Sequence, residues 1–233
     1  MNADGDSRDV RLVVLHDVTD GESGRWQRFV TEVARVIGLA PSYLPAPDHG
    51  ALWMTGILRV AAACPGPVLV LPQRPRSVEE GRPPSLHWAV IASDDSPEVE
   101  RAARLCTVHL LRSGVRTTIL VVLTESSAPP MWEGAGHHAT AWRHELERRY
   151  GRPDHLQVVT GPPGSTIRAQ CAGADLLVLL WHQAIEADRA QVVRSVLGEG
   201  AVQPCLLVPL RWMARSPLSA GMSLDERTVA TGR

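Results

Sequence analysis

The sequence contains no lysine. All 24 basic residues are arginine, and Asn2 is the only asparagine among 233 residues. Without lysine the chain can neither form a Schiff base nor supply the lysine of a phosphate-binding P-loop. The 24 arginines stand against 25 acidic residues, so the formal net charge is −1. There is no basic surplus to neutralise phosphates, which argues against nucleic acid as a partner.

Cysteine pairs and long apolar runs are also missing. The four cysteines, Cys64, Cys106, Cys171 and Cys205, form no C-x-x-C pair, so zinc and thioredoxin-like chemistry are not indicated. We expect free thiols in a reducing compartment. No apolar run reaches the roughly 20 residues that span a bilayer, and the first ten residues do not resemble a signal peptide. We therefore expect a soluble, cytoplasmic protein without membrane contact.

Short apolar runs alternate with segments of helical periodicity. The predicted strands cover residues 11–18, 42–46, 67–72, 86–92, 117–123, 156–160, 175–181 and 205–210. The predicted helices cover residues 25–37, 49–63, 98–113, 139–150, 166–172 and 186–197. Such alternation implies βαβ crossovers. The expected fold is therefore α/β, a doubly wound parallel sheet with helices on both faces.

A polar segment rich in proline and charge, residues 73–85, divides the chain. We expect a short βα repeat over residues 9–76, a complete domain over residues 86–210 and a disordered tail over residues 211–233. The two parts begin and end alike. Each begins with an apolar strand, and each ends with a turn that contains proline and cysteine, followed by a second apolar strand. We interpret the first part as a shortened copy of the second.

Residues 86–210 resemble the universal stress protein family. AVIASDDSP, at residues 89–97, is similar to the family's first strand and its Asp-Gly-Ser-Pro turn, with Asp95 in place of glycine. VVTGPPGSTIRAQCA, at 158–172, and ADLLVLL, at 174–180, are similar to the third and fourth strands with their flanking turns. Residues 196–209 resemble the closing helix and strand. The resemblance implies a nucleotide-binding fold of the tandem type, related to adenine-nucleotide α-hydrolases, with a truncated first copy.

The phosphate-binding signature of ATP-binding members is missing. These members carry glycines after the fourth strand, where backbone N–H groups approach phosphate closely. The matching loop here, LLWHQAIEADRAQ at residues 179–191, contains no glycine. Leu180 and Gln183 occupy two of the glycine positions, and Glu186 and Asp188 add charge that repels phosphate. The loop is therefore interpreted as a degenerate ATP site.

The neighbouring residues complete an altered or vestigial nucleotide cleft, marked by Asp94, Asp95, Leu180 and Gln183. The resemblance implies that Asp94 matches an aspartate that helps hold adenosine. The other interpretation is that Asp94 bonds its own backbone in a turn. Trp181 and His182 are candidates to fill the cleft.

No catalytic or metal-binding set stands out. His137, His138 and His144 lack a further anchored ligand. Ser165 lies outside a G-x-S-x-G elbow and is interpreted as a helix cap. Asp17, at the end of the first strand, is either a turn residue or the first copy's counterpart of Asp94. We therefore expect no enzyme, no catalytic residue and no metal.

The expected function is a regulatory or binding module that acts through protein–protein contact without ATP hydrolysis and without a cofactor. If its last strand, 205–210, had no pairing partner, it would be an exposed apolar edge. We therefore expect either a homodimer or pairing of the two copies within one chain. We also expect an unknown protein partner. One alternative is a sensor that binds ATP or AMP through an altered loop. Another is a small-molecule enzyme.

Overall fold

The computed structural model describes residues 10–16, 23–45, 53–72, 84–94, 96–124, 137–182, 188–198 and 203–213. Its strands are β1 (Leu12–His16), β2 (Pro41–Pro45), β3 (Val68–Val70), β4 (Trp88–Ser93), β5 (Arg116–Leu123), β6 (His155–Thr160), β7 (Leu176–Trp181) and β8 (Cys205–Pro209). Its helices are α1 (Ser23–Ile37), α2 (Trp53–Ala63), α4 (Pro97–Arg112), α5 (His137–Arg149), α6 (Pro163–Gln170), α7 (Asp188–Leu197) and α8 (Leu210–Met213).

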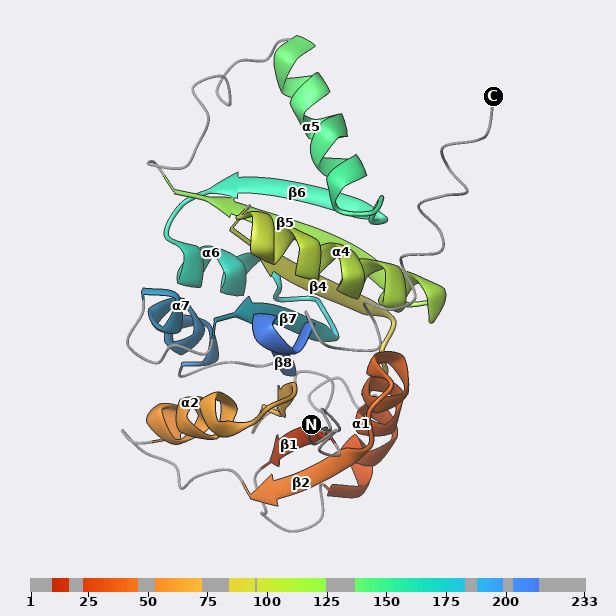
Figure 1. Ribbon diagram of the computed structural model, residues 1–233, viewed down its shortest axis with the longest axis vertical. Helices are drawn as coiled ribbons and strands as arrows, with labels where there is room; N and C mark the ends of the chain where they lie inside the picture. The colour runs from red at the N-terminus through yellow and green to blue at the C-terminus, as the bar shows by residue number, and fades with distance from the viewer. Residues whose placement is uncertain are drawn as a thin grey trace, which may run out of the picture.

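The strands form one sheet in the order β2-β1-β3-β8-β7-β4-β5-β6. Every neighbouring pair is parallel except β3 and β8, which are antiparallel. The first three strands therefore run opposite to the other five. Figure 1 shows the sheet with helices packed along it. The predicted α/β class, with helices on both faces of a mostly parallel sheet, is confirmed.

The central strands are buried on both faces, as their composition requires. Seven of the eight residues of β5, RTTILVVL, are buried, and so are five of the six residues of β4. Strands rich in Val, Ile, Leu and Thr without polar alternation are typical of a parallel sheet covered on both sides. Asp175 fixes the start of β7 to β4, because its Oδ2 accepts the backbone N–H of His87 at 2.9 Å and of Trp88 at 2.8 Å.

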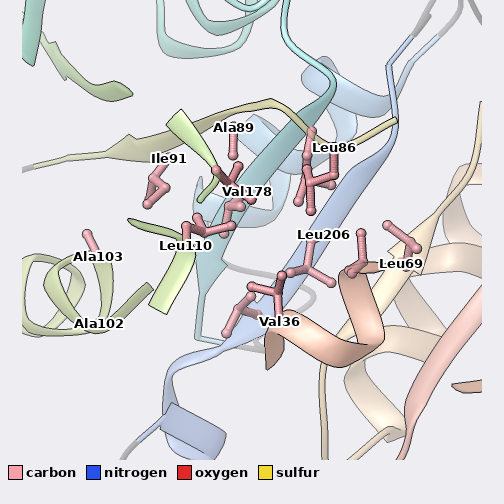
Figure 2. Close-up of a cluster of buried hydrophobic side chains, with 14 of the residues drawn as sticks. Val36, Leu69, Leu86, Ala89, Ile91, Ala102, Ala103, Leu110, Val178 and Leu206 are labelled. Atoms are coloured by element: carbon pink, nitrogen blue, oxygen red, sulfur yellow. The ribbon is translucent and has the colours of Figure 1, made fainter. Parts of the chain in front are cut away.

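Two apolar cores lie on the two faces of the sheet. The α4-side core joins α1, α4, α5 and α8 to the sheet through residues such as Phe29, Leu110, Leu146 and Trp212. Figure 2 shows part of it, with Val36, Ala103 and Leu110 near Ile91, Val178 and Leu206. The α7-side core joins α2, α6 and α7 to the opposite face through Leu58, Ile167 and Val196. Both parts of the chain contribute to each core.

β8 has a partner within the chain. Leu69 of β3 faces Leu206 of β8, and Val68 faces Leu207, in an antiparallel pair. β8 is therefore an interior strand, and its backbone is covered on both sides by β3 and β7. This is the intrachain pairing that the sequence left open beside a homodimer. None of the helices in the described ranges is long and apolar enough to cross a membrane.

Two local expectations are wrong. Ser165 does not cap α6, because the helix already begins at Pro163 and Ser165 Oγ donates to the carbonyl of Pro162 at 3.2 Å. The fixed φ of proline suits the first helical position. The predicted tail also begins as structure: α8 includes residues 211–213, and its Trp212 and Met213 are buried against the α4-side core. The remaining tail residues lie outside the described ranges.

Candidate functional site

The candidate site lies where the order of the sheet reverses. From β4 the chain continues to β5 on one side, and β7 is added later on the other. In open α/β sheets, ligands bind outside the carboxyl ends of the strands at such a point. Ala92 of β4 is level with Leu179 of β7, where the pairing of the two strands ends, so Asp94 and Trp181, each two residues further on, both lie at this end of the sheet.

Asp94 shapes the turn between β4 and α4. Its Oδ1 accepts the backbone N–H of Ser96 at 3.0 Å, a bond that closes an Asx turn. α4 then starts with Pro97 in its first turn, where the missing N–H costs nothing. The turn interpretation of Asp94 agrees with this geometry. Asp95, also named as a site residue, lies outside the described residues.

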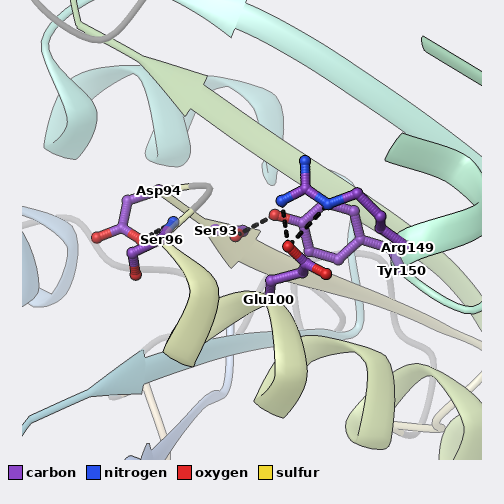
Figure 3. A network of polar contacts seen from close by, with 6 residues as sticks. All are labelled: Ser93, Asp94, Ser96, Glu100, Arg149 and Tyr150. Atoms are coloured by element: carbon purple, nitrogen blue, oxygen red, sulfur yellow. Dashed lines mark hydrogen bonds and ion pairs between the residues drawn. The ribbon is translucent and has the colours of Figure 1, made fainter. Parts of the chain in front are cut away.

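Polar contacts join the start of α4 to the end of α5 next to this turn (Figure 3). The hydroxyls of Ser93 and Tyr150 are 2.7 Å apart and buried. Glu100 accepts from Arg149 Nε at 2.8 Å and also from Nη2 of the same guanidinium. Both nitrogens donate to the same carboxylate oxygen, Oε2, and hydrogen bonds between two charged groups are stronger than neutral ones. The partners are 57 and 49 residues apart, so no local sequence signal could have found them.

The side chains after β7 lie in different surroundings. Leu180 is half-buried and packs against the α4-side core. Trp181 is 1% exposed and belongs to the α7-side core. His182 is exposed, and its Nε2 lies 3.4 Å from a carboxylate oxygen of Glu98 in α4. Of the two residues proposed to fill the cleft, Trp181 is thus buried and His182 is at the surface. Gln183 lies outside the described residues.

Two polar atoms near these strand ends are buried and have no hydrogen-bond partner in the described part of the chain, Ser96 Oγ and Trp181 Nε1. A buried donor without a partner costs about 1–3 kcal/mol. Glu98, beside them, adds negative charge at the start of α4. The arrangement offers hydrogen-bonding groups and an acidic neighbour.

Other residues considered for chemistry do not assemble. Among the described residues, no three His, Cys, Asp or Glu side chains are placed to hold a metal ion. His144 instead lies 3.3 Å from Glu147 on the exposed face of α5. His137 and His138 begin α5, but their side chains are not described. His16 ends β1, and Asp17 lies outside the described ranges.

The cysteines are thiols with little thiolate character. Burial raises the pKa of Cys106 and of Cys171 to about 12. Burial also raises the pKa of Cys205, to which the nearby Cys171 adds a smaller upward contribution. The pKa of the half-buried Cys64 is raised by burial as well. Because the thiolate is the reactive form, these side chains are poor nucleophiles at neutral pH.

We expect thiol labelling to follow this order. At pH 8, a thiol with a pKa of about 12 is ionised in roughly one molecule in ten thousand, so Cys106 and Cys171 should react orders of magnitude more slowly than a free cysteine. Cys64 should react first, because burial raises its pKa less than it raises the pKa of the other three. Mass spectrometry of peptides after timed alkylation measures each site. Labelling in urea, where all four should react alike, is the control, and fast native labelling of Cys171 would contradict the burial.

Comparison with known proteins gives structural matches alone. No family model and no curated protein matches the sequence. A protein from Pseudomonas aeruginosa UCBPP-PA14, described as a candidate universal stress protein, matches at 14% identity with a TM-score of 0.51, over 91% of this chain and 86% of that one. A universal stress protein from Archaeoglobus fulgidus matches at 15% identity with a TM-score of 0.44, over 86% of each chain.

A universal stress protein solved in complex with cAMP matches at 21% identity with a TM-score of 0.41, over 54% of this chain and 98% of its own. Identities this low speak to the fold and to nothing further. The Pseudomonas aeruginosa match has a TM-score above 0.5 and extends over both parts of the chain.

Proposed function

We propose that this chain, which has the fold of the universal stress proteins, is a regulatory or binding module that acts through protein–protein contact and does not hydrolyse ATP. The observation that carries the proposal is the filled end of β7. Trp181 is 1% exposed there, and its neighbour Leu180 packs against the α4-side core.

Bulky side chains at these positions are unfavourable for a triphosphate. A phosphate cradle needs backbone N–H groups that can approach the ligand closely, which glycine permits because it has no Cβ. The segment 179–191 has no glycine, and Leu180 stands at the first position where the resemblance implies one. The Leu180 side chain packs against the α4-side core. Moving it aside to make room for phosphate would therefore cost packing energy.

The charges near residues 179–191 are also unfavourable for phosphate binding. Glu98 lies in the first turn of α4, and the sequence after β7 adds Glu186 and Asp188. Carboxylates beside a helix start stabilise the helix but repel a bound phosphate. Arg189 is the only arginine or lysine in residues 179–191, so these three carboxylates outnumber it.

We expect ATP to leave the thermal stability of the protein unchanged. A ligand present at 100 times its Kd would add about 2.7 kcal/mol to the free energy of unfolding, which a thermal unfolding scan resolves easily. The scan should be run with ATP, AMP and cAMP, each at millimolar concentration with magnesium, and show no shift. Stabilisation by any of them would contradict the proposal.

The same thermal scan should be run on a variant in which Trp181 and His182 are both replaced by alanine, and compared with the parent protein. If the indole occupies the space of a nucleotide, ATP should stabilise the double variant while leaving the parent protein unaffected. The single substitution His182→Ala controls for the loss of the surface imidazole. No response of the double variant would show that Trp181 is core packing rather than a filled nucleotide cleft.

The second candidate function is an adenine-nucleotide sensor with an altered loop. The observation that favours it is the pair of buried atoms that have no partner among the described residues, Ser96 Oγ and Trp181 Nε1, near the carboxyl ends of β4 and β7. A ligand with a hydrogen-bond acceptor at this position would satisfy them. In the same scan this candidate predicts stabilisation by AMP or cAMP that exceeds the effect of ATP, because these ligands carry less charge to the acidic segment.

A further inference from the structure

The sheet has two terminal strands, β2 and β6. A terminal strand presents backbone N–H and C=O groups that can pair with another chain, and proteins usually blunt such edges with proline, charge or a short strand. The two edges of this sheet differ in how they are protected.

Proline closes the β2 edge. Leu12 N–H donates to the carbonyl of Ala40 at 2.9 Å, so Ala40 and every second residue after it face β1. Pro41, Tyr43 and Pro45 therefore turn their backbone groups outward. Two of these three residues have no N–H, which leaves Tyr43 with the single outward donor of the strand. This is the position at which strands tolerate proline.

The β6 edge has no proline of its own. Gly161 N–H donates to the carbonyl of Leu123 at 3.0 Å, so the odd-numbered residues of this segment face β5 and Leu156, Val158 and Thr160 turn their backbone groups outward. Arg143 of α5 confirms the direction, because its Nη2 donates to the outward carbonyl of Leu156 at 2.9 Å.

Neither proline nor a charged side chain of β6 blunts the rest of this edge. The strand HLQVVT contains no proline and no Asp, Glu, Lys or Arg. Within the described residues, no group pairs with the outward N–H and C=O of Val158 and Thr160. Both residues also line an open groove of about 640 Å³ between β6 and α6. The rest of its lining is uncharged: Val159, Ser165, Thr166, Ala169 and Gln170.

We propose that a second copy of this chain pairs with β6, in an antiparallel β6–β6 contact whose twofold axis passes beside Val158. In this register Val158 faces the partner's Val158, and Leu156 faces the partner's Thr160. Each outward residue then exchanges both backbone hydrogen bonds with the residue opposite. The bond from Arg143 to Leu156 is compatible with this pairing, because a carbonyl oxygen has two lone pairs.

The geometry favours a second copy over an unrelated extended peptide. A twofold contact joins the same patch to itself, and here the uncharged side chains of β6 and its groove would meet an equally uncharged partner surface. No charged residue of β6 meets its like across the axis. The groove gives room for the partner's Gln157 and Val159 beside α6. Because proline closes β2 and β3 covers β8, assembly stops at two chains.

The contact deepens the proposed function, since it names one surface for protein–protein contact. We expect sedimentation equilibrium to give twice the 25.3 kDa mass of one chain, falling toward one chain on dilution. Thr160→Pro removes an outward N–H that β5 does not use, so it should keep the fold while raising the dimer dissociation constant about 30-fold, through the loss of two symmetry-related hydrogen bonds.

Two substitutions are the matched controls. Thr160→Val retains the N–H and should leave the dimer intact, and Tyr43→Pro places the same ring at an outward position of the other edge and should not change the mass. Amide hydrogen exchange gives an independent readout. The amides of Val158 and Thr160 should be protected in concentrated protein and exchange rapidly after dilution, while those of Gln157 and Val159 stay protected in both.

A parent protein that remains monomeric throughout would overturn the inference, and so would a dimer that survives Thr160→Pro unchanged. Binding of an unrelated peptide to β6 of the monomeric protein would also overturn it, because the partner of β6 would then not be a second copy of the chain. These readouts are mass and exchange, whereas the proposed function is tested by nucleotide binding, so each can fail without the other.

Discussion

Replacing Trp181 with alanine is expected to lower the free energy of unfolding by about 3–5 kcal/mol, the usual cost of removing a large aromatic side chain from a core. The indole is 1% exposed and packs in the α7-side core, where β7 lies between β4 and β8. A cavity at this position cannot collapse easily, because strands pair on both sides of it. Urea unfolding followed by circular dichroism measures the change.

Trp181→Phe is the informative control. It removes the buried Nε1 that has no partner among the described residues, so part of the lost packing is offset by the removal of an unsatisfied donor. We expect this variant to lose less than about 1.5 kcal/mol. His182→Ala should stay within about 0.5 kcal/mol, as is usual for surface positions. Equal losses for the phenylalanine and alanine variants would contradict a stabilising contribution from the buried aromatic area.

Replacing Gly164 with alanine is expected to destabilise the protein by about 1–3 kcal/mol, the range found for added methyl groups in packed interiors. A Cβ at this position would lie 2.2 Å from Ser195 Oγ and 2.4 Å from Ser195 Cβ. α6 and α7 would therefore have to move apart, and Ile167 and Val196 in the α7-side core would lose contact. Thermal unfolding of the purified variant provides the measurement.

The clash can be tested by its relief. Ser195→Gly alone should cost about 1 kcal/mol as a glycine within a helix, yet in the Gly164→Ala background it should restore stability, because both clashing atoms are gone and Ser195 Cα is 3.6 Å away. We expect a coupling energy of about 1–2 kcal/mol in this double-mutant cycle. Additive losses in the double variant would refute the close approach of the two helices.

The strands were predictable because burial on both faces leaves a local signature. ADLLVLLW contains β7, and TTILVVL accounts for all but one residue of β5. Helix starts were less predictable, since they depend on competition between neighbouring residues. Ser165 has the chemistry of a cap, yet α6 already begins at Pro163, two residues earlier. Trp212 and Met213 lack a local pattern and are fixed by the α4-side core.

The candidate site divides in the same way. The turn at Asp94 is local, since the carboxylate and the N–H of Ser96 are two residues apart, and the sequence identified it. The contacts of Tyr150 with Ser93 and of Arg149 with Glu100 join segments far apart in the chain. They could not be predicted, because a long side chain has many candidate partners until packing brings one of them near.

By itself the sequence determined the α/β class and the order of strands and helices along the chain. It also determined that residues 179–191 have neither the glycine nor the lysine of a phosphate-binding loop. These follow from residue types and their spacing along the chain. The tertiary structure decided that β3 and β8 pair antiparallel, that Trp181 is buried while His182 is exposed, and that the strands at the two edges of the sheet are β2, which contains proline, and β6, which does not. Such features depend on which strands lie next to each other, and strand neighbours are chosen by the burial of apolar faces contributed from distant parts of the chain.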